Sequence, residues 1–283
     1  MMKRIIAPLI DTVTKRYKRW ERTQPFSKRQ QFVGITGILT ILLMLTQLMP
    51  LDFRYPMVAA LFVVSYLLCA FALRDDLRGA EWGTLLILPS FFTAAVAVFY
   101  FLLPTRWLTR LPIAVLYAIG MYALLLTENI YNVAAARTIA LLRAAHSVGF
   151  LLTLATYFLL VQTVLAYRFY GWTNALFIGL ITYPLTLQIL WAINLEPAVG
   201  KRVRELTRII TLVLFELAWI CSLLPVRTTL LALFLTACFY GLAGMGQQYL
   251  ADRLYKRTVW EFFGVVAIVG LILLVTLNWR TAL

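Results

Sequence analysis

Long apolar runs are the feature of this sequence that most restricts its fold. Nine runs are long enough to cross a bilayer as helices, which takes about 17 to 25 residues. They cover residues 32–49, 56–73, 84–103, 111–127, 147–167, 173–194, 206–224, 228–246 and 259–277. The chain is 62% hydrophobic and 13% charged, whereas soluble domains carry about 25% charged residues. The sequence therefore predicts an all-α, polytopic transmembrane helix bundle of about nine spans.

The distribution of basic residues predicts the orientation of the spans. If the N-terminus lies in the cytoplasm, the inner segments hold 20 of the 26 Lys and Arg residues. The outer segments hold the rest, namely Arg54, Arg106, Arg110, Arg168, Arg227 and Arg280. Basic residues mark cytoplasmic loops and attract anionic lipid. We therefore expect a multi-pass plasma (inner) membrane protein with an outer C-terminus, whose partners are anionic inner-leaflet lipids and not nucleic acid.

Residues 1–31 precede the first span and form a basic tail. Apolar residues recur at helical spacing from Ile5 to Trp20, while Lys15, Arg16 and Arg19 fall on the opposite face. This pattern predicts a basic amphipathic helix in the cytoplasmic interface, serving as an anchor or as a docking arm. No Gly-, Ser- or Pro-rich linker divides the remainder, so residues 32–283 are expected to form a single transmembrane helical domain.

Residues 127–146 join the fourth and fifth spans and are unusually polar. As a tenth span, this segment would reverse the orientation of every later loop and place two arginines at membrane depth, which is costly. We therefore expect an amphipathic helix on the cytoplasmic side. Arginine favours phosphate, so the segment is a candidate anion or headgroup site, made by Glu128, Asn132, Arg137, Arg143 and His146. The alternative is a connecting helix with a solvated face.

Glu216 lies in the middle of the span over 206–224. Ionisable residues at that depth usually face the bundle interior, so we expect Glu216 to point inward. Pro184 should bend the preceding span near Tyr183 and Gln188, at a similar depth. These observations predict an intramembrane polar or proton site of Glu216, Tyr183 and Gln188. A purely structural interhelical hydrogen bond is the alternative.

Signatures of common enzymes are absent from the sequence. It contains no HExxH, G-x-S-x-G, Walker or Rossmann pattern. Cys69, Cys221 and Cys238 lie within apolar runs without a CxxC motif, and His146 is the only histidine. We therefore expect no metal site, no cofactor and no catalytic residue.

Three functions are compatible with these features. A transporter or carrier for a small solute or lipid would use the Glu216 group, and we rank it first. A lipid-handling enzyme or headgroup-binding protein would use the polar residues of 127–146. A structural subunit or scaffold, partnered by other membrane subunits, would need neither group.

Overall fold

The computed structural model describes residues 27–48, 50–74, 81–103, 107–134, 141–196 and 198–276. All regular secondary structure in these ranges is helical, which confirms the predicted bundle. The helices are α2 (Lys28–Thr46), α3 (Leu51–Leu73), α4 (Glu81–Thr84), α5 (Ile87–Tyr100), α6 (Trp107–Ala134), α7 (Leu142–Ala166), α8 (Gly171–Asn194), α9 (Lys201–Cys221), α10 (Thr228–Leu250) and α11 (Lys256–Val275). The predicted amphipathic tail helix lies outside the described residues.

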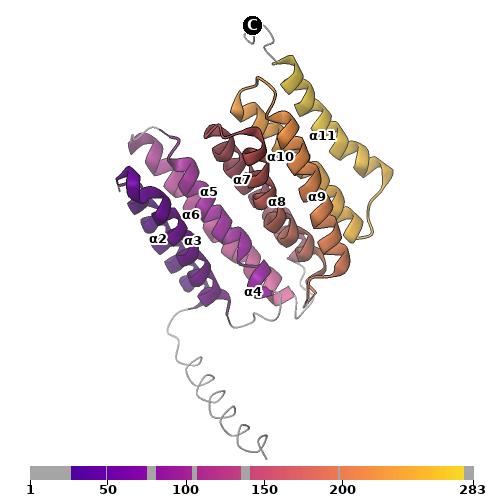
Figure 1. Ribbon diagram of the computed structural model, residues 1–283. Helices are drawn as coiled ribbons and strands as arrows, with labels where there is room; N and C mark the ends of the chain where they lie inside the picture. The colour runs from indigo at the N-terminus through magenta and orange to yellow at the C-terminus, as the bar shows by residue number, and fades with distance from the viewer. Residues whose placement is uncertain are drawn as a thin grey trace, which may run out of the picture.

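The long helices run alternately in opposite directions, so the bundle has two ends (Figure 1). In that view α2 begins at the lower end and α11 finishes at the upper end. The lower helix ends carry Arg74, Arg143, Lys201 and Arg253, and the upper ones carry Arg54, Arg110, Arg168 and Arg227. The lower end is therefore the one that the basic residues predict to face the cytoplasm.

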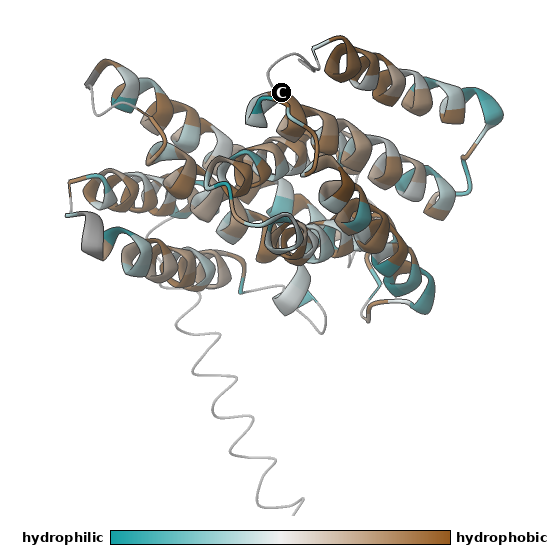
Figure 2. Ribbon diagram, turned by 45° about the horizontal axis from the view of Figure 1, so that its top comes forward, coloured by the Kyte–Doolittle hydropathy of each residue, from teal (hydrophilic) through white to brown (hydrophobic). Residues whose placement is uncertain are grey.

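Eight helical segments of the described chain are long and apolar enough to cross a membrane. Figure 2 shows that the helices are mainly hydrophobic along their length. The long helix outside this group is α9, which has 21 residues but carries Arg204, Glu205, Arg208 and Glu216. Because α9 packs against α8 and α10, it belongs to the same bundle. The chain is thus a multi-pass helical membrane protein.

The expected separate helix over residues 127–146 is wrong. Instead, α6 continues unbroken to Ala134, and α7 already begins at Leu142. The helix extends past its predicted end because Glu128 and Asn132 turn into the bundle, where other helices supply hydrogen-bond partners. Among the described residues of this segment, Glu128 and Asn132 therefore belong to α6 and Arg143 and His146 to α7, so they do not share one helix face.

Helix α7 occupies the centre of the bundle and packs against α5, α6, α8 and α10. Its approach to α6 depends on Gly149, where an added Cβ atom would lie 2.6 Å from the hydroxyl oxygen of Tyr131. That hydroxyl donates a hydrogen bond to the carbonyl of Ala145 at 2.9 Å. The N-terminal end of α7, which carries Arg143 and His146, is thereby fixed against α6.

Candidate functional site

Members of the two predicted site groups meet in the bundle interior. Gln188 of α8 donates a hydrogen bond from Nε2 to Oε1 of Glu128 of α6, over 2.6 Å. Asn132, one turn further along α6, donates from Nδ2 to the carbonyl of Leu73 at the end of α3, over 2.9 Å. Glu128, Asn132 and Gln188 are only 0%, 2% and 4% exposed. We call these three residues the interior polar cluster.

Glu216 and Tyr183 do not join Gln188. Glu216 is exposed on α9, so the expectation that it points inward is wrong. Tyr183 is also exposed, on α8. The inward face of α9 is formed by Val203, Thr207, Ile210, Leu214, Ala218 and Cys221. Apart from Thr207, whose hydroxyl donates to the carbonyl of Val203 on the same helix, these side chains are apolar and need no polar partner. A carboxyl group in the same place would need one. The three predicted residues therefore do not form one site.

A groove runs along α7 beside the end of α8, α10 and the start of α11. It consists of two adjoining cavities of about 690 Å³ each. Both cavities are lined by Arg143, His146, Ile193, Ala251 and Arg253, which makes them continuous. We call this feature the α7–α10 groove.

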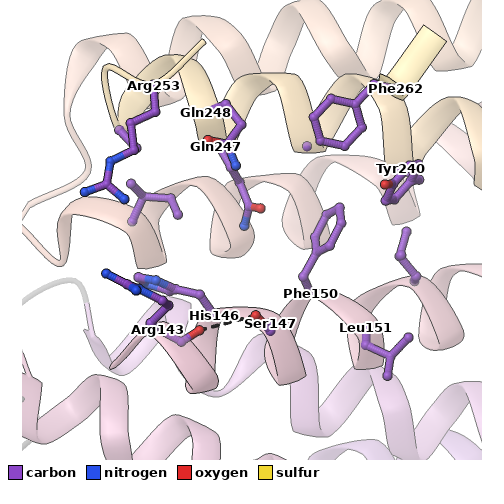
Figure 3. A pocket seen from close by; sticks show the side chains of 14 residues that line it. Arg143, His146, Ser147, Phe150, Leu151, Tyr240, Gln247, Gln248, Arg253 and Phe262 are labelled. Carbon is purple, nitrogen blue, oxygen red and sulfur yellow. Dashed lines mark hydrogen bonds between the residues drawn. The ribbon is translucent and has the colours of Figure 1, made fainter. Parts of the chain in front are cut away.

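One end of the α7–α10 groove is basic. Figure 3 shows Arg143 and His146 on one wall and Arg253 on the other. The imidazole Nε2 of His146 donates a hydrogen bond to the carbonyl of Ala192 over 2.8 Å. Ala192 lies in the last turn of α8, where backbone carbonyls lack intrahelical partners. His146 is thus held against α8, and the two exposed arginines are the groups positioned to bind an anion.

The other end of the groove is apolar and aromatic (Figure 3). The ring of Tyr240 lies 5.6 Å from the ring of Phe150 and 5.1 Å from that of Phe262, measured between centroids. Phe262 fits against α10 because residue 244 is glycine. A Cβ atom at this position would lie 2.5 Å from Cε1 of Phe262. Leu151 and Leu154 complete this wall. The groove therefore changes from basic to apolar along its length.

Glutamine side chains of α10 lie between these two ends. Gln247 donates from Nε2 to the carbonyl of Ile189 over 3.3 Å, and Gln248 lies beside it on the same wall. Ile189 directly follows Gln188 in α8. The α8 backbone therefore separates the groove from the interior polar cluster.

The structure divides the predicted headgroup residues. Arg143 and His146 line the groove, whereas Glu128 and Asn132 belong to the interior polar cluster. Arg137 lies outside the described residues. Sequence reasoning missed the opposite wall, including Gln247, Arg253 and Phe262. In the sequence, Arg253 stands out only as one of the basic residues that predict the orientation. No pattern in the neighbouring residues predicts a pocket there.

Comparison with known proteins assigns the chain to a family. No curated protein and no solved structure matches the chain. Residues 48–277 match a family described as "Protein of unknown function (DUF5656)". The matched region contains α3 to α11, and with them the interior polar cluster and the α7–α10 groove. Because the match covers well over half of the chain, this protein belongs to the DUF5656 family.

Proposed function

We propose that this membrane protein binds an anionic lipid in the α7–α10 groove, as a lipid carrier or headgroup-binding protein. The observation that carries the proposal is that one continuous groove has two arginines at one end and an aromatic wall at the other. Arg143 and Arg253 offer guanidinium groups, which bind phosphate oxygens in pairs. Phe150, Tyr240 and Phe262 offer apolar surface for an acyl chain.

The place of the groove supports a lipid, and its size is compatible with one. Each cavity has about 690 Å³, within the range of about 300 to 1,000 Å³ that small-molecule sites occupy. That volume suits a headgroup with the first part of its chains. Since the basic end lies where the Lys and Arg distribution predicts the cytoplasm, we infer that the lipid comes from the inner leaflet.

The scaffold alternative rests on a different observation. Helix α11 packs mainly on α10, and only 6% of its apolar span is buried. Trp260 and Phe263 are 71% and 59% exposed on it. If α11 holds a partner subunit, Trp260→Ala with Phe263→Ala should release a protein that co-purifies with the wild type in mild detergent. Lipid binding in the groove does not require that partner.

Lipid titration of the full-length protein in detergent tests the proposal. Native mass spectrometry would count bound phosphatidylglycerol and, in parallel, phosphatidylcholine with the same acyl chains. We expect preferential binding of phosphatidylglycerol, weakened about tenfold or more by Arg143→Ala with Arg253→Ala, because two charge-assisted contacts are lost.

A matched control variant removes two arginines elsewhere at the same end of the bundle. Arg204 and Arg208 are exposed on α9 and do not line the groove. Arg204→Ala with Arg208→Ala should therefore bind phosphatidylglycerol like the wild type. Equal weakening by both double variants would show attraction to net charge alone, and would refute the groove as the binding site.

A further inference from the structure

Three oxygen atoms of the interior polar cluster are buried without a hydrogen-bond donor among the described residues. They are Oε2 of Glu128, Oδ1 of Asn132 and Oε1 of Gln188. A buried acceptor without a partner costs about 1–3 kcal/mol, and native proteins keep few of them. Three such atoms on interacting or neighbouring side chains therefore indicate a ligand.

The amide groups of the cluster are oriented by hydrogen bonds. The Nε2 atom of Gln188 is directed at Glu128, and the Nδ2 atom of Asn132 at the Leu73 carbonyl. Since each nitrogen is engaged, each amide leaves its oxygen available as an acceptor. Glu128 and Asn132 are four residues apart on α6, so their side chains lie on the same face of that helix. The cluster thus contains buried, unpaired carboxyl and amide oxygens from two neighbouring points on α6 and from the residue of α8 that is bonded to Glu128.

The chemistry of the cluster identifies the class of ligand. Carboxylate and amide oxygens are hard ligands that suit alkali and alkaline-earth cations. The described residues contain no group of three His, Cys, Asp or Glu side chains that would hold a multivalent metal. One carboxylate balances a single positive charge. Among the described residues, no Lys, Arg or His side chain pairs with Glu128.

We propose that Glu128, Asn132 and Gln188 bind one monovalent metal cation of the size of sodium inside the bundle. This site goes beyond lipid binding and lies behind the groove. Ile189 directly follows Gln188, and Ala192 lies about one turn further along α8. Their carbonyls accept hydrogen bonds from the groove residues Gln247 and His146. A cation that fixes Gln188 against α6 therefore also fixes the α8 wall of the groove.

Thermal unfolding of the full-length protein tests the cation site. Melting temperatures are measured in NaCl, KCl and choline chloride at equal concentration. At about 100 times the dissociation constant, NaCl should raise the melting temperature by roughly 5–10 °C over choline chloride. Glu128→Gln should abolish this difference. Glu216→Gln, which changes an exposed carboxyl on α9, should retain it.

Direct binding to the wild type keeps the test decisive if Glu128→Gln does not fold. Equilibrium dialysis with radioactive sodium should find one ion per chain, displaced by unlabelled NaCl but not by choline chloride. Equal melting temperatures in all three salts, without bound sodium, would overturn the proposal. A melting temperature that responds to pH but not to the alkali cation would assign a proton to Glu128 and would equally overturn it.

Discussion

Gln188 of α8 and Glu128 of α6 are joined by a hydrogen bond of 2.6 Å between buried side chains that lie 60 residues apart in the chain. The two helices are otherwise not closely packed against each other. Helix α7 lies between them in sequence and packs on both. This contact therefore ties the first half of the bundle to the second, next to the α8 wall of the groove.

Replacing Gln188 by Leu should destabilise the protein by about 1–3 kcal/mol, because the buried carboxyl of Glu128 loses its hydrogen-bond donor. Chemical unfolding in detergent measures the loss. Tyr183→Phe, which alters a partly exposed residue of the same helix, is the control and should change stability little. The double variant Glu128→Leu with Gln188→Leu should be less destabilised than the two single variants combined. Simple additivity would contradict a direct interaction.

Gly244→Ala should weaken the packing of α11 on α10, because the added Cβ atom would overlap the ring of Phe262. We expect a loss of about 1–3 kcal/mol, typical of overpacking. Gly264 on α11 has no atom within 4 Å of an added Cβ atom. Gly264→Ala should therefore stabilise the helix by about 0.5–1 kcal/mol. If unfolding measurements find Gly244→Ala as stable as the wild type or more stable, the close contact at Gly244 is wrong.

His146→Ala should loosen the last turn of α8, because the carbonyl of Ala192 loses its donor. Hydrogen–deuterium exchange should become faster in peptides that cover residues 189–196, with a stability loss of about 1 kcal/mol. Ser147→Ala, at the next and exposed position, serves as the control. Unchanged exchange in the His146 variant would show that the histidine does not hold α8.

Glu216→Leu should leave stability within about 0.5 kcal/mol of the wild type, or raise it, because this carboxyl lies exposed on α9. An apolar side chain is also better suited to lipid than a carboxyl group. The free energy of unfolding in detergent and the melting temperature in lipid nanodiscs measure the effect. A loss above about 2 kcal/mol would instead mean that Glu216 has a buried partner in the folded protein.

The membrane bundle could be predicted because apolar runs of sufficient length determine it directly. The position of Glu128 could not, because a polar residue near the end of an apolar run has the same pattern whether it faces water or a buried partner. Its partner, Gln188, lies on another helix. For Glu216, the position in the middle of an apolar run predicted an inward side chain, but the residue lies on the exposed face of α9. That face turned outward because small and apolar residues on the opposite face pack better.

The groove depends on packing between distant segments. The local sequence pattern marks Arg143 as a candidate, but Arg253 and Phe262 reach the same cavity only because α10 packs beside α7 and α11 packs on α10. Gly241 and Gly244 of α10 permit the close contact between α10 and α11. Helical periodicity reports which face of a helix is apolar, but not which other helix covers it.

Photocrosslinking tests lipid binding in the groove most directly. The protein is reconstituted with a phosphatidylglycerol that carries a photoactivatable diazirine on one acyl chain, and labelled peptides are identified by mass spectrometry. Labelling should concentrate on the apolar wall, at Leu151 and Phe262, and should fall when Arg143→Ala and Arg253→Ala are combined. Equal labelling of exposed positions on other helices, such as Ile41 and Val63, with no effect of the arginine variants, would contradict the account.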